Sequence, residues 1–188
     1  MSQFLLEGPS QEPVSIADAK RWLRVEHAQD NDLIGALIVS ARMLVEQTTR
    51  VLLLSQRWRI TCLAALAGGG IELPLAPILS VDQVRLQPLA GASFTLDAAS
   101  WRLDRAGDVA RLELLSLTAA TFDARIEIDV TAGFGSSAAD VPSPLIQAVR
   151  MLVARWYDHR GDASIVREAA VAPHDVMALL APYRRMRL

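Results

Sequence analysis

The chain has 188 residues, 52% of them apolar, and a formal net charge of −2 at pH 7. That length suits one well-packed domain or a core domain with an insertion, and the near-neutral charge argues against a general nucleic-acid binder. No window reaches about 18 uncharged apolar residues, and the first residues lack the basic and apolar regions of a signal peptide. We therefore expect an intracellular protein without a membrane span, whose surplus apolar surface is covered in an oligomer.

The first block of the chain is predicted to be helical. Ser15 is placed to cap a short helix over 16–25, because it precedes an apolar pattern and has Asp18 three residues later. Asp30 or Asn31 is placed to cap a longer helix that reaches about Arg50.

The longer helix carries two apolar stripes. The main stripe follows a spacing of about 100° per residue and predicts the core face. It consists of Leu33, Ile34, Leu37, Ile38, Ala41, Leu44, Val45 and Thr48. A second stripe, Ala36, Val39 and Met43, lies across the helix, and one neighbour does not explain it. It is either an intramolecular contact or a subunit interface.

The middle block alternates between apolar and polar residues like strands of a small antiparallel sheet. The expected strands lie near 71–73, 81–87, 94–96, 101–103, 109–114 and 125–131. The last of these is predicted to be a half-buried edge or surface strand. The carboxylates of Asp97, Asp104, Glu127 and Asp129 are interpreted as solvated. Cys62, the single cysteine, excludes an internal disulfide or cysteine metal cluster and is expected to be a small core residue.

The third block is helical again and begins at Pro142 and Pro144, which Ser143 separates. Its helix follows the i, i+3, i+4, i+7 rule with Leu145, Ala148, Val149, Leu152, Val153, Trp156 and Tyr157. Ile146 widens this apolar arc beyond what burial against one neighbour requires. A final short helix begins at Pro173, and the chain ends in a basic tail.

The residues favour no catalytic chemistry. Gly133 to Ala138 nominally fits the G-x-G-x-x-G/A dinucleotide pattern, but prolines delay the following helix, whereas a bound pyrophosphate needs the helix to begin inside the glycine turn. The three histidines lack metal-ligand spacing, and no nucleophile elbow is present. We therefore predict no catalytic residues, no metal and no cofactor. A small-ligand or nucleotide-binding enzyme that uses the Gly133–Gly135 loop is the alternative.

Three of the tryptophans are candidates for either the hydrophobic core or a contact with a partner. Trp22 and Trp156 lie on the expected core faces of separate helices, and we predict that they pack within the bundle. Trp101 lies in a loop-rich stretch, where an aromatic side chain serves either the core or a partner contact.

These patterns predict an α+β fold. We expect a single domain with a helical core over 13–54 and 142–181, a β-rich insertion over 55–133 and a C-terminal tail over 182–188.

The order and spacing of five segments resemble a known family, the head-to-tail connectors (adaptors) of long-tailed bacteriophages, prophages and gene transfer agents. The resemblance covers about Pro13 to Gly161 and is carried by structural rather than catalytic motifs. The segments are Pro13–Val25, Asp32–Glu46, Leu54–Trp58, Ile71–Val81 and Val130–Arg160.

This resemblance implies a ring of about a dozen copies, a dodecamer, beneath the portal protein in the neck of a virion-like particle. The ring would extend the DNA channel without sequence-specific binding and would join the next neck or tail component, a stopper or tail terminator. Assembly in the bacterial cytoplasm, without a membrane, is implied as well. A different neck or tail-completion protein is the alternative within this class.

Two groups of site residues follow as hypotheses. Relatives commonly clasp the portal with the C-terminal segment, and the end of this chain combines aromatic, arginine and apolar residues suited to anchoring. The portal-binding residues would be Tyr183, Arg184, Arg185, Met186, Arg187 and Leu188. The subunit-interface residues would be Ala36, Val39, Met43, Trp101, Ile146 and Met151.

Overall fold

The computed structural model describes residues 1–63, 70–88, 92–107, 109–115, 124–159 and 172–185. The chain forms two compact units. The sheet unit contains Met1–Gly8 and Ser55–Gly133, and the helical unit contains Pro9–Leu54 and Phe134–Leu188. The chain is thus α+β as predicted. Its first eight residues belong to the sheet unit, so that unit is more than an insertion between helices.

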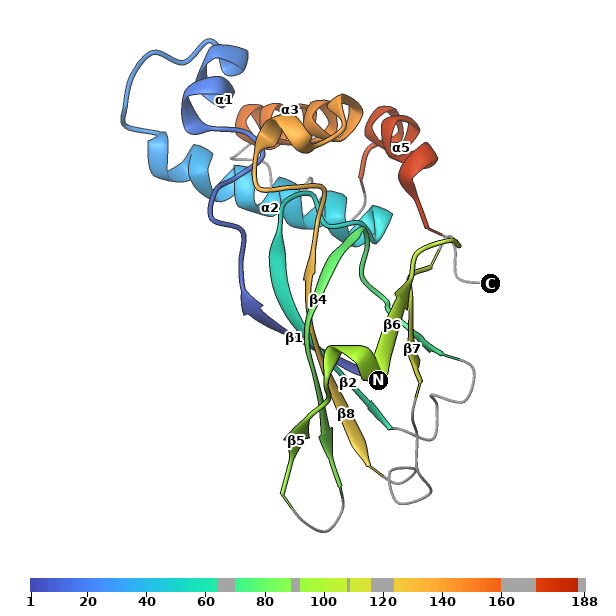
Figure 1. The fold of residues 1–188 in the computed structure, drawn as a ribbon. Coiled ribbons are helices and arrows are strands. Elements are labelled where there is room, and N and C mark those ends of the chain that lie inside the picture. The colour runs from blue at the N-terminus through green and yellow to red at the C-terminus, as the bar shows by residue number, and fades with distance from the viewer. Residues whose placement is uncertain (64–69, 89–91, 108, 116–123, 160–171, 186–188) are drawn as a thin grey trace. The chain divides into compact units, whose positions relative to one another are not determined.

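Two antiparallel sheets make up the sheet unit (Figure 1). The larger has the order β1-β2-β8-β4-β5 and the smaller the order β3-β7-β6. The larger contains β1 (Ser2–Glu7), β2 (Gln56–Leu63), β8 (Arg125–Ala132), β4 (Ile78–Gln87) and β5 (Phe94–Thr95). The smaller contains β3 (Ile71–Glu72), β7 (Arg111–Leu114) and β6 (Trp101–Asp104), which follows a 3-10 turn at Ala98–Ser100.

Strand β8 is the centre of the larger sheet, so its prediction as an edge or surface strand is wrong. It pairs with β2 on one side and β4 on the other, and Ile128 lies between Ile60 and Val84. All three of these side chains are fully buried. The polar residues that alternate along β8 caused the error, because they indicate a solvated face.

The polar face of β8 is instead an ion cluster. Asp129 is 5% exposed. Arg59 on β2 donates to both of its carboxylate oxygens, from Nε at 2.7 Å and from Nη2 at 2.9 Å. Arg85 on β4 donates from 3.3 Å and also lies 3.2 Å from Glu127. The interpretation of Glu127 and Asp129 as solvated is therefore corrected: a buried carboxylate needs cations and hydrogen bonds, and the flanking strands supply them.

Strand β1 has no counterpart among the predicted elements. All six of its residues are exposed, and it pairs antiparallel with β2. Its sequence, Ser-Gln-Phe-Leu-Leu-Glu, lacks the alternation that marks a half-buried strand. Main-chain pairing with β2, rather than burial of side chains, therefore defines it.

The helical unit contains four helices and two 3-10 turns in its described part. These are α1 (Ile16–Leu23), α2 (Asn31–Thr49), η4 (Ala138–Asp140), α3 (Ser143–Asp158), α5 (His174–Leu180) and η5 (Ala181–Tyr183). Ser15 caps α1 as predicted, accepting from the Asp18 N–H. Asp30 is the N-cap of α2, but its carboxylate accepts from the Tyr157 hydroxyl of α3 instead of from the helix.

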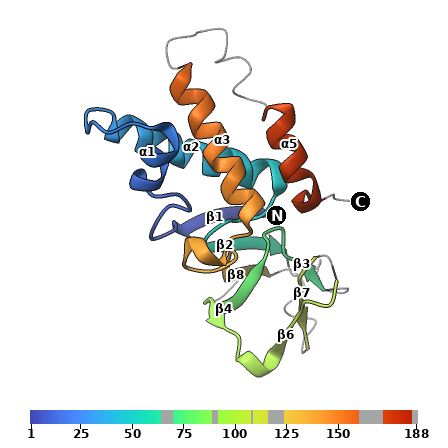
Figure 2. The same ribbon diagram turned by 90° about the horizontal axis from the view of Figure 1, so that it is seen from above.

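Helix α3 is covered within its own unit. It lies across α2, with α1 towards one side and α5 towards the other (Figure 2), and it contacts all three. Leu145, Val149 and Leu152 are fully buried, and Ile146 is 9% exposed. Three neighbours therefore account for the broad apolar arc that the sequence analysis attributed to more than one partner.

The prediction for Trp22 is wrong, whereas that for Trp156 is confirmed. Trp156 packs against the helical core. Trp22 is 48% exposed, because α1 is only eight residues long and Ala19 is its buried residue. A short helix has one narrow contact line, and Trp22 lies off it.

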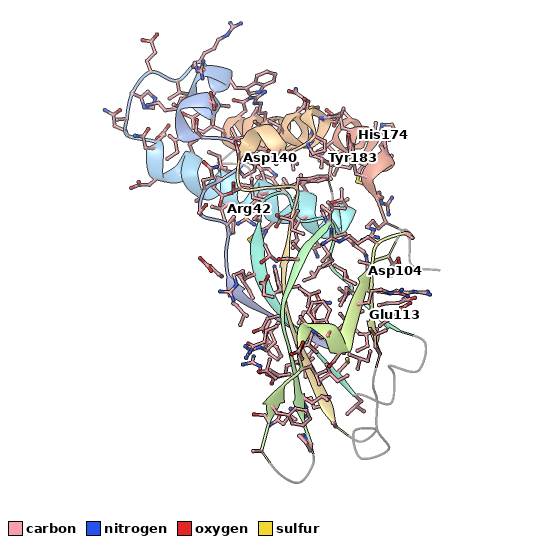
Figure 3. All side chains as sticks on the ribbon, viewed as in Figure 1. Arg42, Asp104, Glu113, Asp140, His174 and Tyr183 are labelled. Carbon is pink, nitrogen blue, oxygen red and sulfur yellow. The ribbon has the colours of Figure 1, made fainter. Side chains whose placement is uncertain are left out.

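Arg42 joins three parts of the helical unit. It is 8% exposed and projects from α2 (Figure 3). Its guanidinium donates to Glu12 at 2.8 Å and to Glu46 at 2.9 Å. Glu46 also accepts from the Leu53 N–H at 2.9 Å. One buried cation thus connects α2 with the segment that enters the unit before it and the segment that leaves the unit after it.

The ion cluster around Asp129 predicts a pH-dependent contribution to stability. The hydrogen bond from Arg59 holds the pKa of Asp129 below its ordinary value, despite burial. A carboxyl with a lowered folded-state pKa stabilises the fold above its unfolded value of about 3.9 and loses that contribution as the pH falls through the folded value. Asp129→Asn should lower the free energy of unfolding at pH 7 by about 2 kcal/mol, measured by urea denaturation.

The difference in the free energy of unfolding between wild type and Asp129→Asn should become smaller below about pH 4, where the Asp129 carboxylate becomes protonated. Glu113→Gln is the matched control, because Glu113 on β7 (Figure 3) pairs with Arg102 on β6, whose side chain is 67% exposed. An exposed pair contributes under about 1 kcal/mol. Equal losses for both variants, or a loss for Asp129→Asn that does not depend on pH, would contradict a buried ion cluster.

Candidate assembly surfaces

The second stripe of α2, hereafter the α2 stripe (Ala36, Val39 and Met43), is exposed. Its buried counterpart is the face with Ile34, Ile38, Ala41 and Val45. Val39 is 36% and Met43 is 58% exposed. Among the described residues, no other part of the chain therefore buries the stripe, as an intramolecular contact would require. The stripe is available to a partner. An exposed methionine and valine on a long helix suit an apolar contact.

The other predicted interface residues offer less surface. Ile146 belongs to the helical core, and Met151 packs against that core. Trp101 begins β6 and is half-buried. Ile146 and Met151 thus mainly stabilise their own unit, whereas Trp101 belongs to the sheet unit and the α2 stripe to the helical unit. The role of all these residues in assembly stays a prediction.

The first part of the C-terminal segment is attached to the helical unit. Tyr183 packs against the core, and the Arg185 N–H donates to the Thr49 carbonyl at 3.1 Å. Figure 3 shows Tyr183 close to α5, within the helical unit. Arg184 is exposed. Met186, Arg187 and Leu188 lie outside the described residues.

The loop before α3 has a structural explanation. Asp140 accepts from the Ser137 N–H at 2.9 Å, and Ser137 caps the short η4 turn in return. A Cβ on Gly135 would lie 2.3 Å from the Asp140 carboxylate, so only glycine allows this approach. The loop donor that a phosphate would require already binds a carboxylate, and its negative charge would repel a nucleotide. This geometry disfavours the dinucleotide reading of the motif.

A hollow of about 500 Å³ lies beside β1. Phe4, Leu6 and Leu63 supply its apolar lining, and Arg59, Arg125 and Glu127 supply charge. Phe4 and Leu63 are 56% and 57% exposed, so this is an open depression rather than an enclosed site. No sequence pattern predicted this hollow, because β1, which forms one wall, lacks the alternation of a half-buried strand.

Chemical groups elsewhere follow structural roles. Burial raises the pKa of the Cys62 thiol, which is a core residue as predicted. Asp97 and Asp104 accept from backbone N–H groups two residues later, in turns.

Among the described residues, no three His, Cys, Asp or Glu side chains could jointly hold a metal ion. The helices described here are too short or too polar to cross a membrane.

Comparison with solved structures identifies relatives over the whole length. A chain from the neck of an empty gene transfer agent (GTA) particle with C6 symmetry has 30% identity and a TM-score of 0.80. A chain from the virion of the native GTA particle has 31% identity and a TM-score of 0.79. A chain from the neck of the native particle with C12 symmetry has 30% identity and a TM-score of 0.70. Each alignment covers 100% of this chain and 97% of the other.

No profile of a known protein family matches the chain. No curated protein matches it either. The solved relatives are components of GTA particles, two of them seen in particle necks. With identity of 30% or more over the full length, the chain belongs to the head-to-tail connector family of phage and gene transfer agent necks.

Proposed function

We propose that the chain is a non-enzymatic subunit of a connector ring between the portal and the tail of a phage-like particle. The observation that carries this proposal is the full-length similarity to chains in GTA necks. The ring would extend the channel through which DNA passes, and its lower face would receive a stopper or tail terminator. Its mechanism is assembly: each copy adds through repeated contacts, and the portal sets the number of copies.

The surface of the described residues supports this role. A closed ring with one subunit type requires two unlike flanks that meet head to tail. The α2 stripe supplies one apolar patch suitable for a flank, and an apolar patch in contact with a neighbour contributes affinity by excluding water. The near-neutral charge suits a channel subunit, because many exposed cations would bind the DNA backbone and slow its passage.

Portal binding is assigned to the C-terminal residues Tyr183 to Leu188. Tyr183 and the Arg185 backbone anchor the start of this segment on the helical unit. The side chain of Arg184, which lies between these two anchoring residues, is exposed. An anchored segment loses less conformational entropy on binding than a free one, which favours affinity for a partner.

Removal of the gene should stop particle assembly at one step. If the chain joins heads to tails, DNA-filled heads and separate tails accumulate, and wild-type protein supplied in trans restores joined particles. Electron microscopy of cell lysates measures this ratio. Joined particles in the absence of the chain, or absence of the chain from isolated necks, would refute the proposed function.

Substitution in the α2 stripe should weaken self-association without unfolding the chain. Met43→Asp introduces a charge at a position that is 58% exposed, so its effect on unfolding should stay within about 0.5 kcal/mol. Sedimentation should show association weakened by about tenfold or more, equivalent to about 1.4 kcal/mol. Ala17→Asp, an exposed change in α1, is the control. Equal association of both variants would remove the stripe from the interface.

Shortening the C-terminal segment should separate portal binding from folding. Deletion of residues 186–188 together with Arg184→Glu leaves Tyr183 packed, so we expect an unchanged thermal midpoint but loss of capture on immobilised portal rings. Deletion from Pro182 onwards also removes Tyr183 from the core and should lower the midpoint. Normal capture by the shorter deletion would exclude this segment from portal binding.

A further inference from the structure

Both edges of the larger sheet are open among the described residues. Strand β1 forms one edge, and its apolar residues Phe4, Leu5 and Leu6 are 56%, 51% and 42% exposed. Soluble proteins usually protect such an edge with lysine, proline or a covering segment. Strand β1 contains neither lysine nor proline, and a register shift occurs only towards its end, between Leu5 and Glu7. Such an edge is suited to pairing with another strand.

The opposite edge is also short of partners. Strand β5 has only two residues, Phe94 and Thr95, and pairs with Arg85 and Leu86 of β4. Phe94 is 47% exposed. In the part of the chain that the structure describes, each edge therefore combines main-chain groups that no outer strand pairs with an exposed large apolar side chain.

These two apolar side chains lie on the same face of the sheet. Leu5 is opposite Trp58 on β2, and Phe94 is opposite Leu86, which continues through Ile126 to Cys62 on β2. Trp58 and Cys62 are four residues apart, and residues opposite one another share a face, so the alternation of β2 places Leu5 and Phe94 together. This face also carries the buried Ile60 and Ile128.

The directions of the two edge strands match as well. Because all pairings in the sheet are antiparallel, β1, β8 and β5 run in the same direction. Strand β1 placed beside β5 of another copy would therefore pair in parallel and continue the sheet with the same face on the same side. A contact between two unlike edges is heterologous and repeats from copy to copy, as a ring requires.

We propose that β1 of one subunit adds to the β5 edge of a second copy of this chain. One contact then pairs both open edges and covers Leu5 and Phe94 together. On the opposite face, Thr95 of β5 in the second copy would stand at the rim of the hollow lined by Phe4, Leu6 and Leu63 of the added subunit. The choice of a second copy as the partner rests on the proposed ring function. The complementarity of the two edges then identifies β1 and β5 as the surfaces that meet.

Disulfide cross-linking tests this contact. In a Cys62→Ala background, Gln3 or Leu5 is replaced by cysteine together with Phe94 or Leu96, so that four pairs cover the registers of a parallel contact. Within one chain, β1 and β5 are four strand spacings apart, roughly 19 Å. A disulfide spans no more than about 7 Å between Cα atoms, so any bond formed must join two copies.

At least one pair should give covalent trimers and longer ladders on non-reducing gels after mild oxidation of assembled particles. The single-cysteine variants should stop at dimers. Leu5→Cys with Leu63→Cys is the control, because Leu63 is 57% exposed but lies on the interior strand β2 and the other face. Unchanged thermal midpoints show that the variants fold.

The outcomes separate this contact from the proposed function. If the chain is present in necks but none of the four pairs forms a ladder there, β1–β5 pairing is refuted while the connector role stands. If ladders form in solution but the chain is absent from necks, the edge contact is supported and the connector role fails. Ladders equal to those of the Leu63 control would also refute the contact.

Discussion

The buried carboxylate of Asp129 constrains the sheet unit more than any other single group. A charge in the middle of a five-stranded sheet must be paired, because its removal from water costs several kcal/mol. Arg59 and Arg85 reach it from the two flanking strands. A shift of β8 by one residue would turn Asp129 into the apolar face that holds Ile128, so the ion cluster and the hydrophobic core select the same register.

The exposed apolar surface is not confined to the helices. Three neighbouring helices cover the broad arc of α3. The apolar surface left among the described residues includes the α2 stripe and the sheet edges at β1 and β5. These positions suit assembly, because sheet edges contribute directional main-chain hydrogen bonds and the helix stripe contributes non-directional burial. Together they provide the unlike surfaces that a repeating contact requires.

The glycine loop shows how one motif supports two chemistries. Gly133 to Ala138 fits a phosphate-binding pattern by residue type alone. The prolines after it delay helix α3, which the sequence already reveals, and the Asp140 carboxylate binds a loop N–H, which only the structure reveals. Gly135 is needed because a side chain would collide with Asp140. The loop therefore closes a turn before α3, and one of its N–H donors is already used by a carboxylate.

Local chemistry was readable from the sequence: the Ser15 cap, the proline start of α3, the helical periodicity and most strands of the sheet unit. The order of segments indicated the connector family, although the α2 stripe remained ambiguous until its exposure was seen. Strand β1, the central place of β8 and the exposure of Trp22 came from the tertiary structure alone. Periodicity indicates which residues of a segment lie on its apolar face and which on its polar face. Strand order and the contacts of a short helix depend instead on partners distant in sequence, which no local pattern encodes.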